Sequence, residues 1–237
     1  MTYFYEFLDR LAEMPDEPRL AVLKKLGFAA AIDGLSKVGA YKESGNRARF
    51  VSFIRTFSRW ADGERISLPH LVEALSRDTQ PEFQPLREHA DQLFKKSWRP
   101  SSAILPGPHP ITRDPLPDEV FGLWPPGKKI LGKLNSESFS HVHLLYSYRN
   151  SLAHELRERG FALLESNVSF PYYRYTTMYS PDNVEGRKTW LLHYPLGFFS
   201  ALTATCLETL GEWLKAEDID PYVYYRVGSE FMLEELE

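Results

Sequence analysis

The sequence predicts a mainly α-helical protein: a helical bundle of four to five core helices, with additional N-terminal helices, a proline-rich loop and a small β-hairpin. Three observations carry this prediction. Apolar side chains recur at helical spacing in several segments, most clearly at 46–61 and 137–159. Eight of the 17 prolines lie between residues 100 and 126, where no long helix can form. Two segments rich in Tyr, Thr, Phe and Trp flank a turn at 180–183 and predict the hairpin.

The composition is that of an ordinary globular chain. With 237 residues, 43% of them hydrophobic and 25% charged, the chain can bury a core as one domain or two small ones. Its net charge of −4 argues against a general nucleic-acid coat protein, yet leaves room for a local basic site. The N-terminus has no basic start and no apolar signal core, and no segment approaches a membrane span. We therefore expect a cytoplasmic protein with no membrane partner.

The first hundred residues show helical periodicity in five segments, at 3–13, 17–40, 46–61, 67–77 and 82–97. The first predicted helix ends near Pro15. The second either is interrupted at Gly34 or Gly39 or continues through these glycines. The fourth opens at Ser67, a typical N-cap residue. The clearest is the third, whose polar side carries Arg55 and Arg59. These arginines are either a solvated face or a stripe that binds RNA phosphates.

Three parts follow from this pattern: residues 1–100, helical and partly contributing to the bundle; 101–136, a proline-rich loop; and 137–237, with a motif helix, the hairpin and a C-terminal helix. We expect them to form one compact unit. Phe121, Leu123 and Trp124 need burial, so the loop is predicted to be strapped across a helical body. The last helix runs from Leu196 to Lys215. Its apolar row includes Cys206, the single cysteine of the chain. One cysteine excludes a disulfide framework, and its place in the apolar row indicates a small core residue rather than a nucleophile.

The segment 137–159 is a strongly patterned helix with two faces. Its apolar stripe consists of Leu145, Tyr148, Leu152 and Leu156. A second stripe lies roughly opposite and consists of His143, Tyr146, Asn150, His154 and Arg157. Asn150 and His154 are four apart and therefore neighbours, and Arg149 lies on the flank with a stem long enough to reach the histidine. A surface with an imidazole, an amide and a guanidinium suits phosphate chemistry.

The run Arg149-Asn150-Ser151-Leu152-Ala153-His154 resembles the R-(N/D/H)-x(3–5)-H motif of the HEPN superfamily, the higher eukaryote and prokaryote nucleotide-binding domains. The resemblance covers residues 138–215 best and extends to 17–61 only by the number of helices. It implies a bundle of four or five helices with the motif on a late helix. It also implies dimers that bring two motif helices face to face and, as in many members, a metal-independent ribonuclease that needs no cofactor.

Carried over residue by residue, the resemblance implies that His154 is the general acid and base, that Arg149 binds the scissile phosphate and that Asn150 orients His154 or the phosphate. The outward stripe adds Arg157, Tyr146 and His143 as substrate-binding candidates. Implied partners are single-stranded RNA, a second copy of the chain and an antitoxin or regulatory protein, because such proteins commonly serve in toxin–antitoxin or defence systems.

The same residues allow two alternatives to this hypothesis, a non-catalytic module and metal catalysis. In a non-catalytic nucleotide-binding, RNA-binding or interaction module, Arg149 would pair with a nearby carboxylate such as Glu155 or Glu158. Metal catalysis is rejected because His141 and His143 point to nearly opposite sides of a helix. The run that starts at His154 also carries Glu158 where a zinc protease motif has its second histidine.

Overall fold

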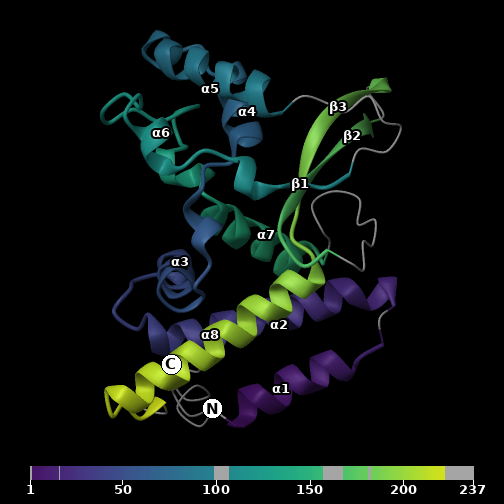
Figure 1. The fold of residues 1–237 in the computed structure, drawn as a ribbon, viewed down its shortest axis with the longest axis vertical. Helices are drawn as coiled ribbons and strands as arrows, with labels where there is room; N and C mark the ends of the chain where they lie inside the picture. Colours follow the sequence, from purple (N-terminus) through teal and green to yellow (C-terminus); the bar gives the residue numbers. More distant parts are fainter. Residues whose placement is uncertain (1, 16, 99–106, 157–167, 181–182, 222–237) are drawn as a thin grey trace, which may run out of the picture. The chain divides into compact units, whose positions relative to one another are not determined.

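The computed structural model describes residues 2–15, 17–98, 107–156, 168–180 and 183–221. In these ranges the chain is mainly helical and carries a small three-stranded antiparallel sheet (Figure 1). The predicted fold class, mainly α with a small β-hairpin, is confirmed. None of the helices in the described ranges is both long and apolar enough to pass through a membrane.

The described helices follow the predicted order along the chain. They are α1 (Thr2–Glu13), α2 (Pro18–Gly39), α3 (Asn46–Phe57), α4 (Leu68–Arg77), α5 (Gln84–Ser97), α6 (Pro117–Phe121), α7 (His141–Glu155) and α8 (Leu196–Ala216). The strands are β1 (His109–Pro110), β2 (Tyr172–Ser180) and β3 (Asn183–His193). Short 3-10 helices add η1 (Ala61–Glu64), η2 (Pro81–Phe83), η3 (Ile111–Arg113) and η4 (Ser136–Phe139). Neither Gly34 nor Gly39 interrupts α2.

The contacts between residues divide the chain into two compact units. Unit 1 comprises Met1–Trp60, Arg149–Glu158 and Leu196–Glu237, and unit 2 comprises Ala61–Tyr148 and Arg159–Pro195. Helix α7 belongs to both, because the division falls between Tyr148 and Arg149.

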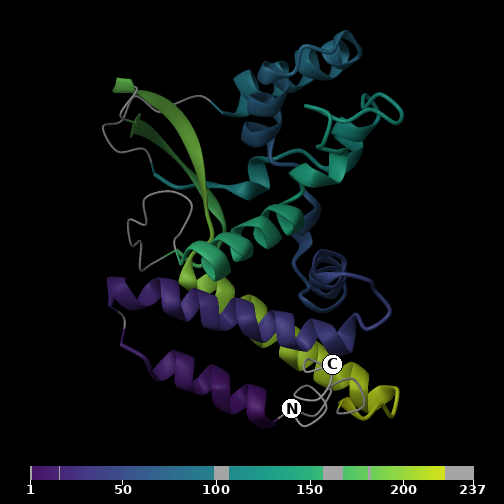
Figure 2. The same cartoon turned by 180° about the vertical axis from the view of Figure 1, so that it is seen from behind.

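Unit 1 is a helical bundle of α1, α2, α3 and α8, joined by the last turns of α7. Helices α2 and α8 pack side by side, with α1 against them, as both views show (Figure 2). The α3 and α8 rows meet where the rings of Phe57 and Trp213 lie 5.7 Å apart. Gly39 permits the close approach of α2 and α3, because a Cβ there would lie 2.7 Å from the Phe53 and Phe57 rings.

Unit 2 contains the hairpin, which confirms the prediction from the aromatic segments. Strands β2 and β3 pair antiparallel, with Tyr173 opposite Leu192 and Tyr175 opposite Trp190. No sequence pattern indicates β1, a two-residue edge strand inside the proline-rich segment that pairs His109 with Tyr173. Its proline is tolerated because an edge strand needs no donor on its outer side.

The proline-rich segment is partly as predicted. Residues 101–106 lie outside the described ranges, and the rest holds only β1, η3, α6 and η4. Trp124 packs against the rings of Phe83 and Phe139, at 5.5 and 6.1 Å. Leu123, in contrast, is 41% exposed, so the expectation that it is buried was wrong.

The motif helix is shorter than predicted at both ends. It begins at His141, after η4, and ends at Glu155 rather than near Gly160, which lies outside the described residues. Leu156 adopts a φ of 49° and is 62% exposed, so it ends the helix and does not belong to the apolar stripe. Leu145, Tyr148 and Leu152 are buried as predicted.

This difference between two leucines gives a test of the helix assignment. Leu152→Ala should lower the free energy of unfolding by about 2–5 kcal/mol, because it opens a cavity at a side chain that is fully buried. Leu152→Asp should prevent folding, because it would bury an unpaired carboxylate. The matched control, Leu156→Ala, should stay within about 0.5 kcal/mol of the wild type. Urea unfolding followed by circular dichroism measures all three, and equal losses in the two alanine variants would contradict the assignment.

Candidate functional site

The motif residues lie on the part of α7 that belongs to unit 1. Arg149 and Asn150 are half-buried, and His154 is exposed in the last turn of the helix. Ser151 and Leu152, which separate them in the sequence, point into the protein and are buried. The three polar motif residues are therefore at the surface or at its edge, as the two-face pattern predicts.

Arg149 is held by an acidic side chain from another helix. Its Nε and Nη2 atoms both donate to Oδ2 of Asp33, in the middle of α2. Its Nη1 atom donates to Oδ1 of Asn150 at 2.9 Å. The arginine is locked, but by Asp33 and not by Glu155 or Glu158, the two partners that the sequence suggested.

The surroundings of Asp33 are crowded with positive charge. Burial raises the pKa of the Asp33 carboxyl above its ordinary value, although Arg149, Lys37 and Arg49 each lower it. Lys37 lies one helical turn after Asp33 in α2, and Arg49 comes from the first turn of α3. Sequence reasoning missed all three. Their one available signal was that Asp33 is the only acidic residue within α2.

His154 makes no hydrogen bond or ion pair within the described ranges, and its ring is at the surface. It follows Asn150 by one turn, so the two side chains lie on the same face of α7. An exposed imidazole beside an oriented amide and a fixed guanidinium can exchange a proton with a bound ligand.

The remaining candidates divide three ways. His143 is 7% exposed, so it does not belong to the outward face. Its Nδ1 atom bonds to the Glu137 carbonyl and to Oγ of Ser140 at 3.1 Å, which ties the start of α7 to η4. Tyr146 is half-buried, and Arg157 lies outside the described residues. The structure therefore does not support a substrate-binding role for His143.

A cluster of metal ligands or a reactive thiol would be a further sign of a functional site. Across the described residues, no group of three or more His, Cys, Asp and Glu side chains is placed to hold a metal ion. Cys206 is fully buried in α8, and this burial raises the pKa of its thiol to about 12. Its interpretation as a core residue is confirmed, because a thiol with that pKa stays protonated and shielded.

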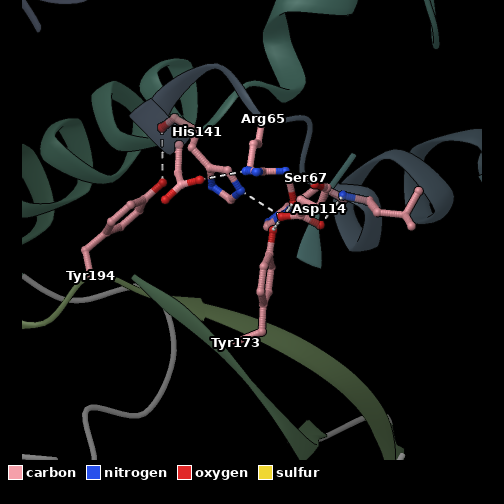
Figure 3. Close-up of polar contacts among 9 residues, drawn as sticks. Arg65, Ser67, Asp114, His141, Tyr173 and Tyr194 are labelled. Atoms are coloured by element: carbon pink, nitrogen blue, oxygen red, sulfur yellow. Dashed lines mark hydrogen bonds and ion pairs between the residues drawn. The ribbon is translucent and has the colours of Figure 1, made fainter. Parts of the chain in front are cut away.

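Unit 2 holds a second group of polar side chains, gathered around the buried carboxylate of Asp114 (Figure 3). Oδ1 accepts the backbone N–H of Leu68 at 3.0 Å, and Oδ2 bonds to Nε2 of His141 at 2.7 Å and accepts the Tyr173 hydroxyl at 2.8 Å. The N–H of Leu68 belongs to the first turn of α4. The sequence predicted that the Ser67 side chain caps this helix, but it makes no capping hydrogen bond. The Asp114 carboxylate accepts the N–H at the helix start instead, from 46 residues away.

The hydrogen-bond directions in this network follow from the Tyr173 hydroxyl, whose single hydrogen is donated to Oδ2 of Asp114. Since Tyr173 donates its single hydrogen to Asp114, the Ser67 hydroxyl donates to the Tyr173 oxygen, over 2.6 Å. Oγ of Ser67 is then left to accept from Nδ1 of His70, also at 2.6 Å. Burial raises the pKa of the Tyr173 phenol well above its ordinary value, so it stays a donor.

The Ser67 and His70 pair is therefore not a nucleophile with its base. A base must take the serine proton, but here the serine hydrogen points to Tyr173 and the histidine donates. Ser67 is also fully buried, where no substrate reaches it. The network around Asp114 is structural, and the motif region of unit 1 is the stronger candidate for a functional site.

Comparisons with known proteins add nothing to this choice, because no family model, curated protein or solved structure matches the chain.

The network around Asp114 gives a prediction about stability. Tyr173→Phe removes one donor from the carboxylate and leaves the Ser67 hydroxyl without its acceptor. We expect the free energy of unfolding to fall by about 1–3 kcal/mol, because both groups are buried. Tyr3→Phe is the control, since Tyr3 is 69% exposed and its variant should unfold like the wild type. Denaturant unfolding that fails to separate the two variants would contradict the network.

The environment of Asp33 gives a prediction about pH. Because its pKa is raised above 3.8, the folded chain binds this proton more tightly than the unfolded chain. The stability due to Asp33 is thus fully present below the unfolded pKa and is lost as the pH rises through the folded pKa. The free energy of unfolding of the wild type, minus that of Asp33→Asn, should decrease from about pH 3 to pH 7.

Glu82 provides the control of opposite sign. The amine of Lys128 donates to its carboxylate and lowers its pKa. The same difference for Glu82→Gln should therefore increase as the pH rises. If the Asp33 difference rose with pH as well, burial would not be the dominant influence on that carboxyl.

Proposed function

We propose that the chain is a metal-independent endoribonuclease of HEPN type that cuts single-stranded RNA at the motif Arg149–His154. The observation that supports this most is the combination of an exposed His154 with a guanidinium held in one orientation, five residues earlier on the same helix. Such a pair supplies a mobile proton and a fixed positive charge, which are the two requirements of phosphodiester cleavage.

In this mechanism the ribose 2′-hydroxyl attacks the adjacent phosphorus, and His154 moves the proton. The bond that forms joins the 2′-oxygen to phosphorus, and the bond that breaks is that to the 5′-oxygen of the next nucleotide. The products are a 2′,3′-cyclic phosphate and a 5′-hydroxyl. No activated water is needed for this step, so the site needs no metal ion.

Arg149 would stabilise the charge that develops on the phosphate. A guanidinium has five N–H donors, and three of them are used by Asp33 and Asn150. The remaining two, one on each terminal nitrogen, are available to a phosphate. In this arrangement Asp33 and Asn150 are positioning residues, because they hold the planar fork still while the substrate binds.

The resemblance also supports a homodimer in which two copies place their motif helices face to face. Such an interface is isologous, so each His154 would approach the motif of the partner subunit. An antitoxin or another regulatory protein would be the expected binding partner in a toxin–antitoxin or defence setting.

The alternative is a non-catalytic module that binds nucleotides, RNA or a protein partner. The contact that favours it is the ion pair between Arg149 and Asp33, which satisfies the guanidinium within the protein itself. The two hypotheses differ in what happens to RNA, and only the first requires His154.

The decisive experiment is RNA cleavage by the purified protein. His154→Ala should abolish cleavage, a loss of about 10²–10⁴ in rate, because it removes the group that moves the proton. Arg149→Ala should lower the rate strongly and leave the helical content unchanged. EDTA should have no effect, and DNA of the same sequence should survive because it lacks the 2′-hydroxyl.

The matched control is His89→Ala, which removes a half-buried histidine of unit 2 whose ring bonds to the Glu119 carbonyl. It should cut RNA like the wild type. Cleavage of DNA, or loss of activity in EDTA that magnesium restores, would mean a different chemistry. If the wild type cuts no RNA at all, the non-catalytic module is the correct interpretation.

A further inference from the structure

Positive charge is concentrated in one part of a chain that is acidic overall. Residues 18–57 contain eight Lys or Arg and only two Asp or Glu, a net charge of +6. The whole chain carries −4, so the remaining residues carry −10. A segregation of this size creates a local positive potential that the net charge conceals.

Part of this charge is exposed on α2 and α3. Lys24 and Lys25 are buried and do not contribute to the surface. Lys37 at the end of α2 is exposed, Arg47 in the first turn of α3 is exposed, and Arg49 is half-buried.

The two arginines in the first turn of α3, Arg47 and Arg49, are not explained by the stability of that helix. Positive side chains in a first turn are unfavourable beside the positive end of the helix dipole, and acidic residues are the usual choice there. The first turn of α3 nevertheless has two arginines and no acidic residue, while Arg55 lies in the last turn, where a positive charge is favourable. Arg49 donates to Oδ1 of Asn46 at 2.6 Å, which orients it without neutralising it.

Lys37 and Arg49 lie near Asp33, the acidic partner of the motif residue Arg149. Lys37 and Arg49 are close enough to Asp33 to act on its carboxyl electrostatically, and Arg149 binds that carboxyl directly. Three positive groups thus surround one negative group within unit 1. Arg149 pairs with the Asp33 carboxylate, so Lys37 and Arg49 add two further positive charges near this ion pair, and a polyanion would bind such a group of charges.

We propose that Lys37 and Arg49 bind the phosphates that flank the one at Arg149, so that the site accepts a run of single-stranded RNA rather than a mononucleotide. The inference rests on the same site as the proposed function but needs only binding, not cleavage. The guanidinium of Arg49 suits a phosphate because its planar donors match two phosphate oxygens. Contacts of this kind read the backbone and not the base, so they select a polyanion without selecting a sequence.

The test is binding of fluorescently labelled oligouridylate, followed by anisotropy at several salt concentrations. The His154→Ala protein is used throughout, so that the RNA stays intact. Adding Arg49→Gln or Lys37→Gln should weaken binding at low salt, and each should reduce the slope of log affinity against log salt by about 0.7. The matching deoxyoligonucleotide should be affected equally, because phosphate contacts do not involve the 2′-hydroxyl.

Lys215→Gln is the matched control, since it removes one exposed positive charge from the same unit at the end of α8. It should leave both the affinity and the salt slope unchanged. If Arg49→Gln and Lys37→Gln behaved like Lys215→Gln, the proposal would be overturned. The same variants are also tested for binding to anionic vesicles. Weaker binding to the vesicles with unchanged binding to the oligonucleotide would likewise overturn the proposal.

The same data separate this proposal from the proposed function. A wild type that binds oligouridylate through Arg49 but never cuts it contradicts the ribonuclease and supports the flanking phosphate contacts. A wild type that cuts RNA while Arg49→Gln leaves binding unchanged supports the ribonuclease and removes the flanking contacts.

Discussion

A carboxylate taken out of water must find hydrogen-bond donors, and each unit of this protein is organised around one such group. In unit 2 the carboxylate of Asp114 receives the first turn of α4, the ring of His141 at the start of α7 and the hydroxyl of Tyr173 on β2. Arg65 adds a bond of 2.8 Å to the Asp114 carbonyl. One side chain from the proline-rich segment thus fixes a helix start, a second helix and the hairpin.

In unit 1 the corresponding group is Asp33, and its consequences concern function as much as stability. It joins the middle of α2 to the motif part of α7 through Arg149. This contact restrains the arginine, which lowers the entropic cost of binding a ligand in one geometry. Lys37 and Arg49 add two further positive charges near the same carboxyl. The site therefore combines order with an excess of charge, and this combination favours an anionic ligand over an apolar partner.

The parts of the fold that depend on local periodicity could be predicted from the sequence, while those that depend on distant partners could not. The apolar rows of α3 and α8 and the alternating aromatic residues of the hairpin are local signals, and they located these elements. The bond between Arg149 and Asp33 spans 116 positions and has no periodic signal. The sequence therefore suggested the neighbouring Glu155 and Glu158 as partners of Arg149. His143 was assigned to the outward face for a related reason, because its partners, the Glu137 carbonyl and the Ser140 hydroxyl, come before the start of α7. Leu156 was wrongly assigned to the apolar stripe, because its left-handed backbone conformation ends the helix there and its hydrophobic side chain gives no sign of this.

The central claim is that α2, the first turn of α3 and the end of α7 together form an RNA-phosphate site. The most direct measurement is an NMR titration of the isotope-labelled protein with a 2′-O-methyl oligouridylate, which keeps the phosphates but cannot be cut by 2′-hydroxyl attack. The account predicts that the largest chemical shift changes fall on Lys37, Arg49, Arg149 and His154. Changes that spare these four residues, or that fall on the hairpin of unit 2, would contradict it.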